Sequence, residues 1–171
     1  MHWKPFSGEK IVSRFKQENF GKILSKINSD AELQSFLALD YVHGMVAYKE
    51  TGCPVAFAIL IDDMDDMKKI NIHGGCWSGS TLDSYHAIFS LIENLFDSGH
   101  SIRTSCTLNN HRAYRFLHSV GFVNHYTSKN YHYFWLPYKR FVNTPIYKWF
   151  HPNTMDEIGY NLVKQLIRFF L

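Results

Sequence analysis

The sequence predicts a mixed α/β fold, and three of its stretches support that prediction. Residues 55–61 (VAFAILI) form a nearly continuous apolar run, which is typical of a strand buried on both faces of a sheet. Leu82 to Phe96 places apolar residues at spacings of three and four, the pattern of an amphipathic helix. Ser101 to Leu108 favours a strand and is followed directly by a helical pattern and a second strand pattern. Strands and helices therefore alternate along the second half of the chain.

The composition is that of an ordinary globular protein. The 171 residues are 46% hydrophobic and 19% charged, with a net charge of +3, which excludes a disordered chain. This length fits one domain with a substantial core. The basic residues are scattered rather than clustered, so nucleic-acid binding is not expected.

The three cysteines, Cys53, Cys76 and Cys106, are isolated and form no CxxC pair. This pattern argues against a disulfide scaffold and a zinc knuckle, and favours a reducing compartment. The first ten residues show no signal-peptide core, and no run approaches the roughly 20 apolar residues of a spanning helix. We therefore expect a cytoplasmic protein without a membrane span.

The N-terminal third is expected to hold two helices. Residues 1–12 read as a lead-in segment anchored by Trp3 and Phe6. Arg14 to Ile27 carries a helical pattern of apolar residues. A second helix is predicted from Ala31 to Leu39, with a cap supplied by residues 28–30.

Three strands follow, over residues 45–49, 55–61 and 70–77. The acidic segment 62–66 lies between the last two of these strands. Clustered carboxylates suit a hard cation, but the segment lacks the glycine and the terminal glutamate of a calcium loop. A solvated hairpin turn is therefore predicted, partly balanced by the lysines at 68 and 69.

In the second half of the chain, helix-capping residues predict where the helices begin and end. Gly99 follows the helix 82–96, and Asn110 is placed to cap the next helix because its side-chain oxygen accepts a backbone N–H. Gly121 is expected to end that helix in the left-handed conformation. A hairpin of strands 123–126 and 131–136 then ends at Pro137.

The last 27 residues, 145–171, are expected to extend a domain that spans residues 1–144. Pro145 and Pro152 predict a loop, and Thr154 with Glu157 resembles the capping box of a final helix. The amphipathic stretch from Met155 to Leu171 leaves three roles open: packing on its own domain, contact with a subunit or protein partner, or contact with a membrane surface.

One motif resembles a known family. Asn110-x-x-Ala113 followed by Gly121-Phe122 is similar to the signature that closes the acyl-CoA site in the GNAT superfamily of N-acetyltransferases. The resemblance covers roughly residues 45–138. It implies a mixed, mostly antiparallel central sheet flanked by helices, acetyl-CoA as acyl donor and an amine acceptor.

The resemblance also places a pyrophosphate-binding loop at Gly79, between a strand and a helix. Unpaired N–H groups and the helix dipole make such a turn suited to phosphate. The family pattern Q/R-x-x-G-x-G/A is matched here only at Gly79, so an ordinary helix-start turn is the alternative. The donor-binding residues implied are Cys76, Trp77, Ser78, Gly79, Ser80, Thr81, Leu82, Asn110 and Ala113.

Two residues, Tyr114 and His73, are candidates for the proton transfers. The family often has a tyrosine seven residues after the asparagine, acting as general acid, but that position is Leu117. Tyr114, one turn earlier, is the candidate substitute, with a plain packing role as the alternative. His73 is the candidate general base because its ordinary pKa suits neutral pH, although it also suits a structural role. Cys106 is a candidate for lining the cleft.

Two functions remain open. If the protein is an acetyltransferase, the strand pair near Cys76 and Cys106 should be splayed. If it is an inactive structural or interaction protein, side chains should fill the groove. The stretch from Asn110 to Gly121 also resembles short phage-encoded proteins of this type, including internal virion components. No metal site is expected, since His111 and His118 lie two helical turns apart. The acceptor is not specified by the sequence.

Overall fold

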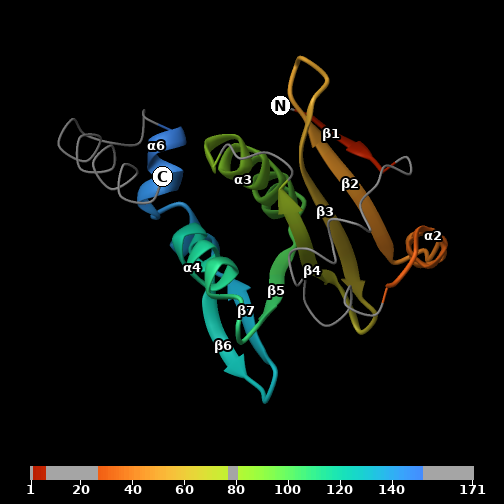
Figure 1. The fold of residues 1–171 in the computed structure, drawn as a ribbon. Coiled ribbons are helices and arrows are strands. Elements are labelled where there is room, and N and C mark those ends of the chain that lie inside the picture. Colours follow the sequence, from red (N-terminus) through yellow and green to blue (C-terminus); the bar gives the residue numbers. More distant parts are fainter. Residues whose placement is uncertain (1, 7–26, 77–80, 152–171) are drawn as a thin grey trace.

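The structure is a computed structural model that describes residues 2–6, 27–76 and 81–151. Its described strands form one seven-stranded sheet in the order β1-β2-β3-β4-β5-β7-β6 (Figure 1). Five of the six neighbouring pairs are antiparallel, and only β4 and β5 are parallel. The mixed, mostly antiparallel α/β sheet expected from the sequence is therefore confirmed.

The elements agree closely with the sequence patterns. The strands are β1 (His2–Pro5), β2 (Val42–Tyr48), β3 (Pro54–Asp63), β4 (Asp66–Cys76), β5 (Ser101–Thr107), β6 (Val123–Thr127) and β7 (Tyr131–Leu136). The helices are α2 (Asp30–Leu37), α3 (Thr81–Asp97), α4 (His111–Val120), α5 (Tyr138–Phe141) and α6 (Pro145–Phe150).

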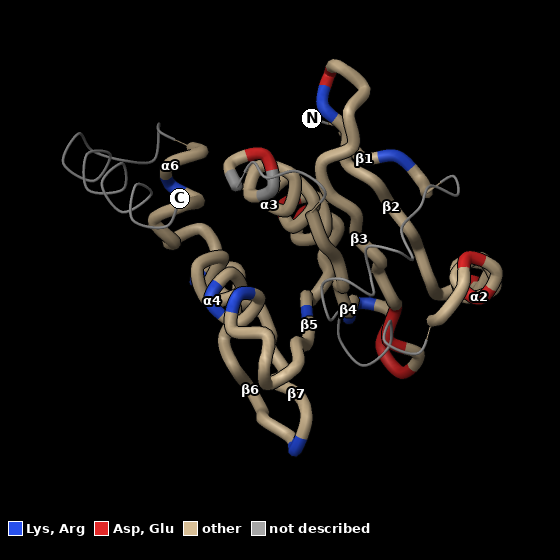
Figure 2. Tube along the Cα trace, in the orientation of Figure 1, with Lys and Arg blue, Asp and Glu red and all other residues tan. Residues whose placement is uncertain are grey.

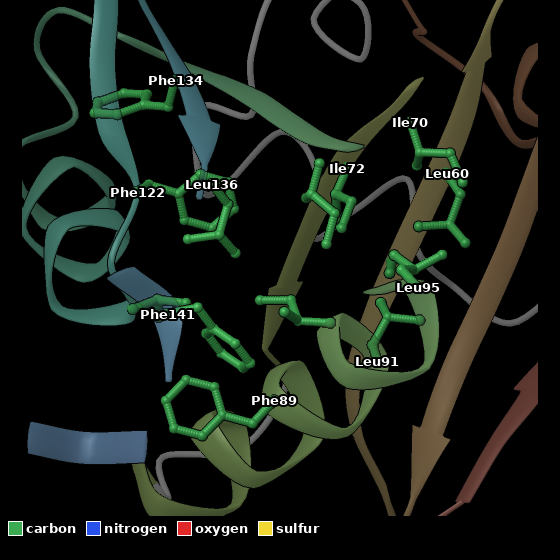
Figure 3. Close-up of a cluster of buried hydrophobic side chains, with 14 of the residues drawn as sticks. Leu60, Ile70, Ile72, Phe89, Leu91, Leu95, Phe122, Phe134, Leu136 and Phe141 are labelled. Carbon is green, nitrogen blue, oxygen red and sulfur yellow. The ribbon is translucent and has the colours of Figure 1, made fainter. Parts of the chain in front are cut away.

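Helices α3 and α4 pack on one face of the sheet, over its main hydrophobic core. Apolar residues of β3, β4, β5 and β7 point toward them in the close-up (Figure 3). Phe89 of α3 lies at the centre of the helical layer, with its ring centroid 5.4 Å from that of Phe141 and 5.5 Å from that of Phe150. Such ring pairs add to the burial energy, so they fix α5 and α6 against α3.

Helix α2 packs on the opposite face. Leu33 is almost fully buried there, together with alternate residues of β2 and β3: Val42, Val46, Phe57, Ile59 and Ile61. The residues between them on β3, among them Ala58 and Leu60, belong to the core on the α3 face. The continuous apolar run of residues 55–61 is thus explained by a strand that is buried on both faces.

The predicted caps are present. Asn110 accepts a hydrogen bond from the amide of Ala113 at 3.0 Å and begins α4. Gly121 ends that helix with φ of 103°, in the left-handed region. Ser29 caps α2, and its hydroxyl oxygen accepts a hydrogen bond from the amide of Glu32. Local side-chain chemistry therefore sets these helix ends.

The lead-in segment requires a correction. Residues 2–5 form an edge strand, β1, paired antiparallel with β2. Trp3 acts as the expected anchor, since its indole Nε1 lies 3.2 Å from the carbonyl oxygen of Ala87 and 3.1 Å from the hydroxyl of Ser90 on α3. Strand β2 also begins earlier than expected, at Val42 rather than at Met45, and it includes Gly44.

The prediction of a loop around Pro145 is wrong. Pro145 is the first residue of α6, where its missing N–H costs nothing, and Thr144 caps the helix by accepting from the amide of Tyr147. Residues 138–141 form the short helix α5. The helix predicted from Met155 to Leu171 and most of that predicted from Arg14 to Ile27 lie outside the described residues.

The acidic segment forms the predicted turn between β3 and β4. Asp63 accepts a hydrogen bond from the amide of Asp65, and Asp66 pairs with Lys69 at 3.0 Å. Local hydrogen bonds and one lysine thus satisfy this turn. Among the described residues, no helix is long and apolar enough to cross a membrane.

Candidate functional site

The candidate site lies where β4 and β5 separate. Only three residue pairs join these parallel strands, and the last pair is Asn71 with Arg103. Beyond it, β4 continues to Cys76 along β3, whereas β5 continues to Thr107 along β7 (Figure 1). The splayed pair expected near Cys76 and Cys106 is therefore confirmed.

The hydroxyl of Thr104 links β5 to β4 at the point where the two strands begin to separate. It donates a hydrogen bond to the carbonyl oxygen of Ile72, with Oγ1 and O 2.6 Å apart. This carbonyl belongs to the first residue of β4 beyond the paired segment. A side chain therefore supplies a partner where the backbone pairing has ended, which limits the cost of the split.

Gly74 allows β4 to stay close to β3 through the split. A Cβ atom at this position would lie 2.5 Å from the carbonyl oxygen of Phe57, a main-chain atom on the neighbouring strand. Any side chain would displace one strand from the other. Glycine is therefore required here to keep β4 paired with β3 while β5 departs.

His73 lies on this part of β4, on the sheet face that carries α2. Its cross-strand partner is Ile59, a member of the core on that face. The side chain is buried, and burial lowers the pKa of His73 to about 4. The imidazole is consequently uncharged at neutral pH, and it is a much weaker base than an exposed histidine.

Two helix N-termini face the same end of the split strands. Helix α3 begins at Thr81, five residues after β4 ends, and α4 begins just after Asn110. Asn110 and Ala113 are brought together by the cap of α4. Cys76 and Leu82 are half-buried at the ends of their elements. The remaining predicted loop residues, Trp77, Ser78, Gly79 and Ser80, lie outside the described residues.

A lysine reaches the first turn of α3 from the far side of β3. Lys49 Nζ lies 2.5 Å from the carboxylate of Asp83, close to the C-terminal end of β2. Lys49 thus balances the negative charge of Asp83, which would otherwise repel an anion bound at the start of α3. Sequence reasoning missed Lys49, because nothing in its local pattern indicates contact with a helix that begins more than thirty residues later.

Tyr114 is packed among rings between α4 and β7. Its ring centroid lies 4.6 Å from that of His118, 4.8 Å from His132 and 5.6 Å from Phe134. Leu117 packs against the main core, three residues further along α4. Tyr114 is thus oriented by its packing toward the β7 side of the split.

Burial also shifts the pKa of two further groups in this region. Burial lowers the pKa of His118, and the charge of Arg140 acts in the same direction. Burial also raises the pKa of the Cys106 thiol to about 11. Cys106 therefore stays a protonated, apolar side chain on the α3 face of the sheet.

The chain matches no protein-family model, and no curated protein sequence matches it. Solved structures do resemble it. One is the aminoglycoside acetyltransferase AAC(6')-Ib with coenzyme A and kanamycin, at 18% identity and a TM-score of 0.61, covering 83% of this chain and 97% of that one. Another is a variant of spermidine N-acetyltransferase SpeG from Vibrio cholerae, at 11% identity and a TM-score of 0.62, covering 84% and 98%.

A third is an uncharacterized protein from Bacillus halodurans, at 14% identity and a TM-score of 0.65, covering 90% of this chain and 91% of that one. Identities this low establish the fold rather than the activity. The chain therefore has the fold of GNAT N-acetyltransferases, as its sequence motif implied.

Proposed function

We propose that this protein is an acetyl-CoA-dependent N-acetyltransferase that acetylates a primary amine of a small molecule or protein. The observation that carries the proposal is the separation of β4 from β5 after Asn71 and Arg103, beside the start of α3. Acetyl-CoA would supply an activated thioester carbonyl, which the amine nitrogen attacks as the carbon–sulfur bond breaks and the sulfur takes up a proton. Two of the structural neighbours are an aminoglycoside acetyltransferase and a spermidine N-acetyltransferase, which supports this choice of reaction.

The donor-binding residues are proposed from both sides of the split. Backbone N–H groups at the start of α3 would hold the pyrophosphate, aided by the helix dipole. The pairing of Asp83 with Lys49 fits this role, since it removes an unbalanced negative charge from that turn. The proposed set is Cys76, Trp77, Ser78, Gly79, Ser80, Thr81, Leu82, Asn110 and Ala113.

Proton transfer is assigned to two groups. His73 is the proposed base; its low pKa keeps the imidazole unprotonated at neutral pH but makes it a weak acceptor. The rate would then depend largely on holding the amine against the thioester, because positioning alone supplies several kcal/mol of the barrier, roughly 7 to 11 in the best cases. Tyr114 is the proposed acid, since Leu117 has no proton to give.

A second function is favoured by the same two residues. A buried histidine and a tyrosine packed among rings also suit a protein that keeps the fold without the chemistry. Such a protein would act by binding a partner, as a structural component does. It would not bind acetyl-CoA, and this separates the two functions.

Thermal unfolding and calorimetry with acetyl-CoA test the proposal. A ligand at a hundred times its dissociation constant should add about 2.7 kcal/mol of apparent stability. Gly79→Asp should abolish the shift by adding a carboxylate to the proposed phosphate site. Gly99→Asp is the matched control, because Gly99 lies beyond the opposite end of α3 with open space around it. No shift in the wild-type protein at millimolar acetyl-CoA would exclude the enzyme function.

A further inference from the structure

Acidic residues are absent from a large part of the chain. None of the 15 Asp and Glu residues lies between Ser98 and Met155, whereas seven Lys and Arg residues do. This range contains β5, α4, β6, β7, α5 and α6. In Figure 2, the acidic positions lie on and beside α2, on α3, and in the turns between β2 and β3 and between β3 and β4, whereas the tubes of β5, β6, β7 and α4 carry none. One half of the sheet therefore offers no carboxylate to a ligand.

The same half of the sheet carries exposed aromatic side chains. On the face away from α3, Trp135 is 46% exposed and Tyr126 is 59% exposed. The ring of Tyr126 stacks on that of Tyr133 with centroids 5.7 Å apart, and Tyr131 lies 6.4 Å from Tyr133. Their neighbours on β7, such as Phe134, are buried on the other face. We call Tyr126, Tyr131, Tyr133 and Trp135 the aromatic face.

Arg103 joins the aromatic face to the split. It is the Cα partner of Trp135 on one side and of Asn71 on the other, at the last pair before β4 and β5 separate. Directly opposite residues of this kind have Cβ atoms about 5 Å apart, so the arginine and the indole are close neighbours. The side chain is exposed and makes no ion pair with any residue that the structure describes.

An exposed guanidinium beside aromatic rings recognises a particular chemistry. Its planar fork binds a carboxylate through two parallel hydrogen bonds. The rings offer stacking surface to another aromatic group. A polycation such as a polyamine would find repulsion from Arg103 here, and no carboxylate on these strands to offset it.

We propose that the acceptor is an aromatic α-amino acid, or a compound with the same arrangement of primary amine, carboxylate and aromatic ring. The carboxylate would bind Arg103 and the ring would lie on Trp135 and Tyr133. The amine, attached to the same carbon as the carboxylate, would then be directed to the split between β4 and β5. This inference rests on the proposed acetyltransferase function and specifies its acceptor.

The test compares four acceptors with acetyl-CoA: tryptophan, tryptamine, spermidine and kanamycin. Tryptamine differs from tryptophan only by lacking the carboxylate. We expect kcat/KM for tryptophan to exceed that for each of the other three by about 10-fold or more, the usual effect of one charge-assisted contact. A preference for spermidine or kanamycin, or equal use of tryptophan and tryptamine, would overturn the proposal.

Substitutions test which side chains recognise the carboxylate and the ring of the acceptor. Arg103→Gln should lower kcat/KM for tryptophan about 10-fold or more and leave that for tryptamine unchanged. Trp135→Ala should lower both. Lys139→Gln removes an exposed positive charge from α5, on the other side of the sheet, and should change neither. Unchanged selectivity in Arg103→Gln would contradict the assignment.

Each variant is also titrated with acetyl-CoA and with tryptophan separately, and its unfolding temperature is measured. Donor binding reports on the proposed function, and tryptophan binding reports on the acceptor. If the wild-type protein binds no acetyl-CoA, the proposed function fails. The aromatic face is then supported by tryptophan binding that Arg103→Gln abolishes, and overturned if tryptophan does not bind.

Discussion

Thr104 on β5 donates its hydroxyl hydrogen to the main-chain carbonyl of Ile72 on β4, with 2.6 Å between the oxygens. The two strands are parallel neighbours only as far as the preceding residues, Asn71 and Arg103. This hydrogen bond therefore marks the place where a continuous sheet changes into two diverging halves. The proposed acyl-donor site depends on that change.

Thr104→Val should destabilise the protein by about 1 kcal/mol. The substitution keeps the shape of the side chain and leaves the carbonyl oxygen of Ile72 without its partner, in a partly buried position. Urea unfolding measures the loss. Thr107→Val on the same strand is the control, with an expected change below about 0.5 kcal/mol. Equal losses in the two variants would mean that the hydrogen bond contributes nothing.

The protein should lose stability as the pH falls from about 6.5 to about 4. The unfolded chain protonates His73 near its ordinary pKa of 6.5, whereas the folded protein resists protonation until the pH reaches about 4. The folded state is thus fully favoured above pH 6.5 and becomes progressively less favoured below it. The difference amounts to about 3 kcal/mol.

His73→Leu tests the origin of that pH dependence. Leucine suits the apolar surroundings of this position and does not titrate, so the free energy of unfolding should depend less on pH between 6.5 and 4. Urea unfolding at several pH values gives the comparison. A variant whose stability declines as steeply as that of the wild-type protein would assign the effect to other groups.

Gly121→Ala should be more destabilising than Gly99→Ala. Both glycines have positive φ, 103° and 82°, so each substitution has a backbone cost of about 1 kcal/mol. A Cβ at Gly121 would also lie 3.2 Å from main-chain atoms of Phe141, whereas nothing lies within 4 Å at Gly99. Thermal unfolding of the two variants measures the difference. Equal losses of stability would show that α5 can move away from the added Cβ without destabilising the protein.

The cysteines should differ in reactivity. Cys53 is exposed and should react with iodoacetamide in the native protein, whereas Cys106 is buried with its pKa raised to about 11 and should react only after unfolding. Mass spectrometry of the alkylated protein identifies the sites. Acetyl-CoA should protect the half-buried Cys76 at the end of β4 and leave Cys53 unaffected. Protection of Cys53 alone would place the ligand elsewhere.

Much of the fold was predictable because its signals are local. The caps at Asn110 and Gly121 lie within four residues of the groups that they satisfy, and the hairpin strands alternate in the expected way. Strand β1 was missed because its four residues include a proline and its partner, β2, begins nearly forty residues later. Helix α6 was missed because Pro145 was interpreted as a helix breaker rather than as a first helical residue.

The candidate site was predictable only in outline. The succession of strands and helices along the chain could be predicted from patterns, but the burial of His73 and the contact between Lys49 and Asp83 depend on strands that pair across the sheet. The same holds for Arg103 and Trp135, whose adjacency follows from the register of β5 and β7. Tertiary contacts of this kind have no signal in a single sequence.

Hydrogen–deuterium exchange with and without acetyl-CoA tests the central claim most directly. If the donor binds between the separated strands and against the two helix starts, amides in residues 72–84 and 104–114 should exchange more slowly in its presence. Helix α2, on the opposite face, should be unaffected. Unchanged exchange in both segments at saturating acetyl-CoA, or protection confined to α2, would contradict the account.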